Sequence, residues 1–588
     1  MLHDNRQRRK ISCSVVFTAL VIFCIAVGLF VWFTAGRVPG RVILEVDFDK
    51  GVTEYVPDDS LARIVMKQRT RLRDVVDALQ RAASDDRVKG LIARVGGPSI
   101  KLARAQELRD AVIAFRSTGK PALCYAETFG EFGPGNVSYY LATAFDEIYL
   151  QPSGDVGLTG LMYEQPFFRG TLDKLGVIPR FDGRKEYKSF RYMFTETKYN
   201  APHREEITAV MNSQFSGIIR GIAERRKKDE PGLRALINKG PFLGHEAVSA
   251  KLVDGLAYRD EVYEKMKARV GAKAELIDLA EYYRRAGGPY EKGTTIALVY
   301  AVGGIERGKS GYNAVTGELV MGSDTIAEAL RKAADDKDVK AVLLRIDSPG
   351  GSYVASDTIW RETVRIRKAG KPLIASMGTV AASGGYFIAV AADRIVAQPA
   401  TITGSIGVLG GKMVTTALWN KLGVTWDEVH TSTNADAWTM TKDLSPEQKR
   451  RFSEWLDRVY DDFTLKVSEG RGMSREDVEK IAKGRIWTGE DAKKIGLVDE
   501  LGGYPAALGA VRKALKLADN ASLKIKVYPE QKTLLKLVSE LKAAVGEDGS
   551  AAVLAQTIEE LQPVARAIKL LELDPATQVL KLNWPEVN

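Results

Sequence analysis

The chain has 588 residues, more than a single hydrophobic core usually serves, so two or more domains are expected. Hydrophobic residues make up 45% and charged residues 27% of the chain, proportions typical of globular proteins that exclude wholesale disorder. The net charge of +10 is small for this length and no Lys/Arg block carries interleaved aromatic residues, so nucleic acid is not an expected partner.

The N-terminus predicts a membrane anchor. Residues 1–10 are basic, and residues 11–35 run without a single charge. About 20 apolar residues suffice to span a bilayer as a helix, and a basic flank stays in the cytoplasm. The alternative is a cleaved signal peptide, whose apolar region is about 7–15 residues long and ends in a small-x-small site. The run at 11–35 is too long and its end fits such a site poorly, so we expect an uncleaved anchor.

The body begins with a pattern that occurs twice. An apolar strand is predicted at 42–46 and another at 296–300. Each is followed by apolar residues at helical spacing, over 72–79 and 326–333. Ser323 stands where it could cap the second of these helices.

Sequence similarity between the two copies continues beyond these helices. VKGLIARV (88–95) matches VKAVLLRI (339–346), and YYLATAFDEIYLQP (139–152) matches YFIAVAADRIVAQP (386–399). Strands that alternate with helices predict parallel βαβ units, and copies of this size are domains rather than solenoid repeats.

These matches divide the body into an N-terminal repeat, 36–290, and a C-terminal repeat, 291–528. The remaining tail, 529–588, has no counterpart in the first copy. It carries an amphipathic helical stripe that we expect to pack on the body or on a neighbouring subunit rather than on a membrane: Leu534, Leu537, Val538, Leu541 and Val545.

Cysteine and histidine are scarce. Cys124 is the one cysteine outside the apolar N-terminal segment, which excludes a disulfide framework in the body. No Cys/His cluster has the spacing of metal ligands, so no metal site is expected. The few histidines also limit the choice of a catalytic base: His3, His203, His245 and His430.

Two glycine-rich motifs in the second copy predict acyl-transfer chemistry. Ser383 lies in ASGGY, between a predicted strand and a helix, where its hydroxyl and the following N–H of Gly384 can face one substrate carbonyl. DSPGG (347–351) follows another strand, and Gly350 or Gly351 could bring a second N–H close. Each motif alone has a simpler explanation, as a turn or as tight helix–sheet packing.

The first copy offers a base for this serine. Lys188, in YKS, could serve if burial keeps its amine neutral. The repeat pairs Ser383 with Asn136 and Lys188 with Ala435, so each copy lacks what the other keeps. A site between the two copies would explain both losses, although drift after duplication would also produce them.

Together these segments resemble the long form of the signal peptide peptidase A family, also called protease IV, whose fold is a branch of the Clp-protease/crotonase fold. The resemblance implies Ser383 as nucleophile, Lys188 as general base, and Gly350 and Gly384 as oxyanion donors. Ser405 of TGSIG matches the family serine that contacts the lysine, with a turn or cap serine as the simpler alternative. The segment after Lys188 departs from the family pattern, which affects substrate preference more than chemistry.

The resemblance further implies a serine peptidase of the bacterial inner membrane, with one transmembrane helix and its body on the periplasmic side. Its substrates would be signal peptides and other apolar peptides left in the membrane after secretion. It would act as a homotetramer, with no metal or cofactor.

Three other interpretations stay open on the residues alone. His430 could replace Lys188 as the base of Ser383. A crotonase-type enzyme that acts on acyl-CoA would also use oxyanion glycines, although its substrates are cytoplasmic. Finally, the chain could be a non-catalytic membrane-anchored scaffold that keeps the fold.

Overall fold

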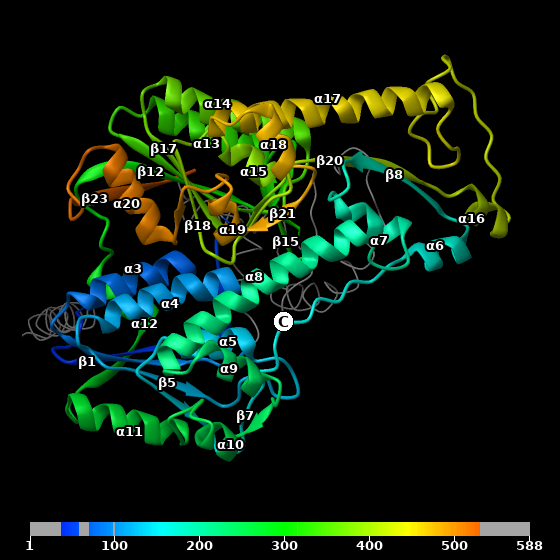
Figure 1. Cartoon of the computed structure of the whole chain (residues 1–588). Helices are drawn as coiled ribbons and strands as arrows, with labels where there is room; N and C mark the ends of the chain where they lie inside the picture. Colours follow the sequence, from blue (N-terminus) through cyan, green and yellow to red (C-terminus); the bar gives the residue numbers. More distant parts are fainter. Residues whose placement is uncertain (1–36, 58–69, 98–99, 314–315, 530–588) are drawn as a thin grey trace, which may run out of the picture.

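The computed structural model describes residues 37–57, 70–97, 100–313 and 316–529 (Figure 1). The predicted basic tail at 1–10, the anchor at 11–35 and the stripe in the C-terminal tail lie outside these residues. Within the described ranges, none of the helices is long and apolar enough to cross a membrane.

The first half of the body forms a six-stranded sheet whose neighbours all run parallel. Its order is β10 (Gly255–Leu256), β6 (Glu147–Leu150), β5 (Ala122–Ala126), β4 (Val88–Arg94), β1 (Val42–Asp47) and β11 (Glu275–Asp278). The central strands β4 and β5 are rich in apolar residues and mostly buried, as expected for a parallel sheet covered on both faces.

The second half repeats this order. Its parallel strands are β22 (Glu500–Leu501), β18 (Arg394–Ala397), β17 (Leu373–Ala382), β16 (Ala341–Ser348), β12 (Thr294–Val302) and β23 (Leu523–Tyr528). The sheet is extended by β19 (Ile402–Gly404), which is parallel to β17, and by β21 (Ile486–Thr488), which is antiparallel to β19. The predicted α/β class is therefore confirmed.

Both predicted helices that follow the first strands are present. In α3 (Leu72–Ala83) and α13 (Ser323–Asp335) the apolar positions at helical spacing are buried. The prediction that Ser323 caps α13 is wrong. Gly322 occupies the N-cap without any side-chain bond, and Ser323 is already the first helical residue, because strand β15 (Glu318–Gly322) runs directly into the helix.

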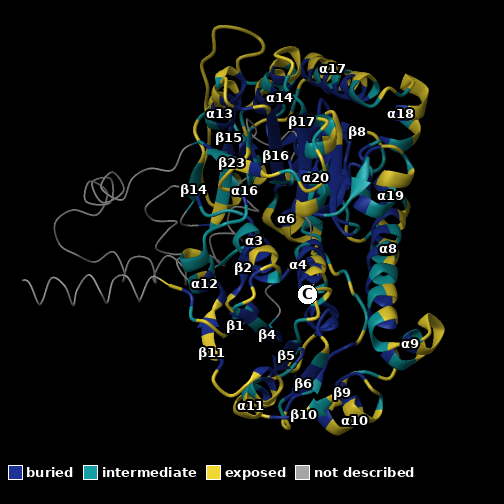
Figure 2. Ribbon diagram, turned by 90° about the vertical axis from the view of Figure 1, so that its left-hand side faces the viewer, coloured by how far each residue is buried: buried dark blue, intermediate teal, exposed yellow. Residues whose placement is uncertain are grey.

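Helices of the first half lie between the two sheets (Figure 1). Among them are α4 (Leu102–Arg116), which packs against β17, and α8 (Ala201–Arg226), which packs against β21. Figure 2 places the buried residues in both sheets and the exposed ones on the outer helices. The two halves thus share an extensive buried contact.

A region that we call the arm, residues 178–200 and 408–444, also joins the halves, to the right in Figure 1. There β8 (Ile178–Arg184) of the first half pairs antiparallel with β20 (Val408–Val414) of the second. Helix α17 (Pro446–Arg471) packs on both strands. The segment between β8 and α8 holds Lys188, so the arm carries this residue to the second half.

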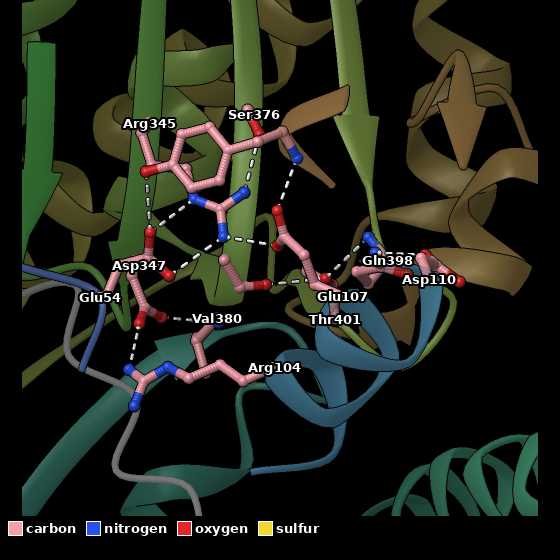
Figure 3. Close-up of polar contacts among 12 residues, drawn as sticks. Glu54, Arg104, Glu107, Asp110, Arg345, Asp347, Ser376, Val380, Gln398 and Thr401 are labelled. Atoms are coloured by element: carbon pink, nitrogen blue, oxygen red, sulfur yellow. Dashed lines mark hydrogen bonds and ion pairs between the residues drawn. The ribbon is translucent and has the colours of Figure 1, made fainter. Parts of the chain in front are cut away.

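A buried ionic cluster lies at the centre of the contact between the halves (Figure 3). Arg345 of β16 donates to both carboxylate oxygens of Glu54, at 2.7 and 3.0 Å, and to Glu107 of α4 at 2.9 Å. It also donates to Ser376 Oγ at 2.9 Å. All three charged side chains are at most 2% exposed, so two carboxylates of the first half depend on one cation of the second.

Replacing Arg345 by methionine should therefore destabilise the body by about 3–5 kcal/mol, because the carboxylates of Glu54 and Glu107 would stay buried without their cationic partner. The midpoint of urea-induced unfolding measures this effect. Arg220→Met is the matched control, since Arg220 also joins the halves, through Glu490 at 2.6 Å, but is 48% exposed. The control should lose about 0–1 kcal/mol. Equal losses in the two variants would contradict the prediction.

Candidate active site

Ser383 lies at the turn between β17 and α15 (Gly384–Ala389). Its backbone has φ 57° and ψ −118°, an unusual conformation for a residue with a side chain. The turn is held by a bond from the Ser383 N–H to the Gly404 carbonyl at 2.8 Å. Ser383 is fully buried.

The glycines after Ser383 are required by close packing. A Cβ atom on Gly384 would lie 2.6 Å from Ser356 Oγ, and one on Gly385 would lie 2.6 Å from the Ser348 carbonyl oxygen. Larger residues would push the helix start away from the DSPGG loop. The motif therefore brings the beginning of α15 against that loop.

Lys188 reaches Ser383 from the other half of the chain. Its Nζ lies 2.7 Å from Ser383 Oγ, and the lysine is only 1% exposed. The backbone of Lys188 packs closely against Gly484, where a Cβ atom would lie 2.8 Å from the Lys188 Cα. Tyr187 donates its N–H to the Lys483 carbonyl at 3.1 Å, which fixes the segment further.

Burial lowers the pKa of Lys188 to about 7, because the charged amine loses its water; the carboxyl of Glu206 opposes this shift. An amine with that pKa is substantially neutral near pH 7, so it has a lone pair that can accept a proton. A lysine with its ordinary pKa of about 10.4 would be protonated there.

Ser405 completes the surroundings of the amine. Lys188 Nζ lies 3.0 Å from Ser405 Oγ and donates to the Ser405 carbonyl at 3.1 Å. Ser405 is fully buried, has φ 51°, and donates its own N–H to the Arg485 carbonyl at 2.7 Å. The structure thus brings Ser383, Lys188 and Ser405 together, and these contacts aim the amine at the Ser383 hydroxyl.

The two glycines of DSPGG differ in their contacts. The Gly350 N–H donates to Ser348 Oγ at 3.2 Å, and the Gly350 carbonyl accepts from Ile305 at 2.9 Å. Ser352 donates to the Ile305 carbonyl at 2.8 Å, so the N–H of the intervening Gly351 points away from Ile305. The Gly351 nitrogen lies 3.2 Å from where a Cβ on Gly384 would stand.

Gly351 occupies a position that requires glycine. Its φ of 155° favours glycine, and a Cβ atom there would lie 2.1 Å from the Ile305 carbonyl oxygen. The Gly351 nitrogen thus lies beside the start of α15, whereas the Gly350 N–H is engaged by Ser348.

Sequence reasoning missed one buried carboxyl near this site. Glu206 of α8 is fully buried, and it accepts from the Ile486 N–H at 3.4 Å. Its Oε1 has no partner among the described residues. Burial raises the pKa of Glu206 to about 8. Nothing in the sequence distinguishes Glu206 from the rest of the 75 acidic residues of the chain.

The counterparts of Ser383 and Lys188 form no second pair. Asn136 begins α5 (Asn136–Ala142) and is buried, with its side chain bonded to the backbone of Thr159 and Gly160. Ala435 is exposed on the arm. Of these two related positions, neither carries the chemistry of the site at Ser383.

His430 lies apart from this arrangement. It is exposed on the arm, with Nδ1 3.3 Å from a Glu428 carboxylate oxygen. Glu428, His430 and Asp436 place possible metal-ligand atoms within 4.8 Å of one another. Lys442 already contacts Glu428 and lies 3.8 Å from Asp436, so the lysine ammonium takes the place beside these carboxylates that a metal ion would need.

A family model and several long relatives match this chain. The sequence model described as "Peptidase family S49" matches residues 114–273 and 365–518. Protease 4 of Salmonella typhi is 32% identical over 90% of this chain and 87% of its own length. A chloroplastic serine protease SPPA of Arabidopsis thaliana is 30% identical over 75% of this chain and 65% of its own. A ClpP1 mutant from Listeria monocytogenes aligns with 37% of this chain and 94% of its own, at 14% identity and a TM-score of 0.23.

Proposed function

The chain belongs to peptidase family S49 and is a serine-type peptidase, and on that premise we propose that Ser383 is its nucleophile and Lys188 its general base. The 2.7 Å contact between Lys188 Nζ and Ser383 Oγ carries this proposal. The low pKa of Lys188 supports it, because a buried neutral amine can take the hydroxyl proton.

The reaction follows from these contacts. Neutral Lys188 takes the proton of Ser383 as its oxygen attacks a peptide carbonyl, and the N–H groups of Gly384 and Gly351 hold the oxyanion. Gly351 takes the role expected of Gly350, because the Gly350 N–H is engaged by Ser348. Protonated Lys188, oriented by Ser405, gives its proton to the leaving amine, and water activated by the same lysine then releases the acyl group.

We further propose that the protein is held in the inner membrane by residues 11–35, with its body in the periplasm. The uncharged run and the basic residues before it support this orientation. A peptidase tethered at a bilayer meets apolar peptides there, which supports cleaved signal peptides as the substrate class.

Cleavage of a synthetic signal peptide in detergent micelles tests this substrate class. The full-length protein should cut within the apolar core of the peptide, and should cut poorly an analogue of equal length with two core leucines replaced by aspartate. Ser383→Ala serves as the background control. Equal cleavage of the polar analogue would refute the assignment while leaving the peptidase chemistry intact.

We also propose that the protein forms a homotetramer, in which each chain contributes two crotonase-like repeats and contacts its neighbours head to tail. The pairing of β8 with β20 supports it. The repeat relates β8 to residues 425–431 and β20 to 161–167, and neither segment is in a strand within the described ranges. In 425–431, Val429 is 101% and Trp426 59% exposed. The 425–431 segment of one copy could pair with 161–167 of the next, and such heterologous contacts close into rings.

Light scattering in mild detergent should therefore give the mass of a tetramer for the wild type. A Trp426→Asp/Val429→Asp variant should give that of a monomer, because charge replaces the apolar contact. Lys449→Asp, on the exposed part of α17, is a control that should leave the tetramer intact. A monomeric wild-type protein would contradict this proposal.

A further inference from the structure

Residues 349–351, which we call the oxyanion loop after the role proposed for Gly351, are tied by the side chain of Asp347 to the strand that precedes Ser383. The pairing of β16 with β17 shifts between Ile346 and Ser348, so the regular ladder is interrupted at Asp347. Its Oδ1 accepts the N–H of Val380 at 3.0 Å. Val380 lies near the end of β17, and Pro349, Gly350 and Gly351 follow β16 directly. The carboxylate therefore sets the position of the loop relative to the nucleophile.

The second oxygen of this carboxylate is held from the other half of the chain. Arg104 of α4 donates from Nη2 to Asp347 Oδ2 at 2.8 Å and from Nη1 to the Val52 carbonyl at 3.1 Å (Figure 3). The side chains of Arg104 and Asp347 are only 16% and 10% exposed. A charge pair with so little access to water is weakly screened, so it constrains the carboxylate strongly.

There is little room for Asp347 to turn. A Cβ atom on Gly378 would lie 3.0 Å from the Asp347 side chain, and the Asp347 carbonyl accepts the Gly303 N–H at 3.0 Å. Each carboxylate oxygen thus has a fixed donor on a different element. Without Arg104, Oδ2 would be left partly buried and unpaired, and the carboxylate would have to move to find another donor.

We propose that Arg104 is a positioning residue for the reaction at Ser383: it orients Asp347, which in turn sets the Gly351 N–H at the distance from Ser383 that an oxyanion requires. This inference rests on the proposed catalytic function. It also gives the first half of the chain a second role besides supplying Lys188, because that half holds the oxyanion loop in register.

Arg104→Met in the full-length protein tests the inference. The kcat for a chromogenic peptide should fall about 10- to 100-fold while KM changes less than about twofold, because misplacing one donor weakens transition-state binding. The affinity for a peptide aldehyde, whose adduct with Ser383 carries an oxyanion, should fall in parallel with kcat. Affinity for the matching peptide alcohol, which forms no adduct, should stay unchanged.

Two further variants separate positioning from general stability. Arg104→Lys keeps one charged donor and should restore most of kcat. Asp347→Asn should lower kcat similarly, and adding it to Arg104→Met should cost little more, because both act through one contact. Arg220→Met, which removes an exposed link between the halves, is the control and should match the wild type.

Wild-type kcat and aldehyde affinity in Arg104→Met would overturn the inference. So would a loss of kcat with unchanged aldehyde affinity. If Arg104→Met fails to fold, Asp347→Asn decides the question by the same two measurements. Failure of the proposed function itself would look different, because the wild-type protein would then neither cleave peptides nor bind the aldehyde through Ser383.

Discussion

Ser383→Ala should remove peptidase activity, with a loss in kcat of about 10⁶-fold, the magnitude seen when a serine peptidase loses its nucleophile. The physical reason is that the variant has no hydroxyl at this position to attack the substrate carbonyl. Ser383 lies at the turn directly before Gly384, and Lys188 Nζ lies 2.7 Å from its Oγ. Hydrolysis of a chromogenic peptide by the detergent-solubilised protein measures the effect.

The serine variant should fold normally, since only one small polar group is removed. Ser138→Ala is the matched control, because Ser138 is a buried serine on α5, the counterpart of α15 in the first half. It should keep wild-type kcat. Activity in Ser383→Ala above one-hundredth of the wild-type value would show that another residue attacks the substrate.

Lys188→Met and Lys188→Arg should both lower kcat by about 10⁴-fold or more. Methionine fills the space of the lysine stem without an amine. Arginine keeps positive charge and donors, but it cannot give up its proton, so it cannot serve as a base. A lysine that only stabilised charge would be replaced in part by arginine, and the pair of variants therefore separates the two roles.

The pH dependence of the wild-type protein gives an independent test of the same role. The pKa of Lys188 is lowered to about 7, and its neutral form is the proposed base. Activity should therefore rise with pH through about 7 and fall about tenfold for each unit below it. Lys442→Met, an exposed lysine on the arm, should leave this profile unchanged. Activity independent of pH between 5 and 9 would contradict a lysine base.

Much of the fold was predictable because the sequence contains the same pattern of strands and helices twice. Matching strands at 88–95 and 339–346 gave parallel βαβ units in both halves, and both sheets have the same strand order. The complementary losses at Asn136 and Ala435 predicted a site between the halves. The structure brings Ser383 and Lys188 into contact, although they are 195 residues apart.

Other features depend on geometry that the sequence does not encode locally. The difference between Gly350 and Gly351 comes from which N–H is engaged by Ser348, a matter of backbone direction within one motif. The contact of Arg104 with Asp347 joins residues 243 apart, and arginine is common in this chain. Ser323 was misjudged because a strand runs directly into its helix, leaving no loop residue for a side-chain cap.

Labelling with a fluorophosphonate probe, followed by peptide mapping, tests the central claim most directly. The account predicts that the probe modifies Ser383, that the rate rises with pH through about 7, and that Lys188→Met abolishes the reaction. Absence of labelling in the wild-type protein, or labelling of Ser383 at the same rate in Lys188→Met, would contradict it.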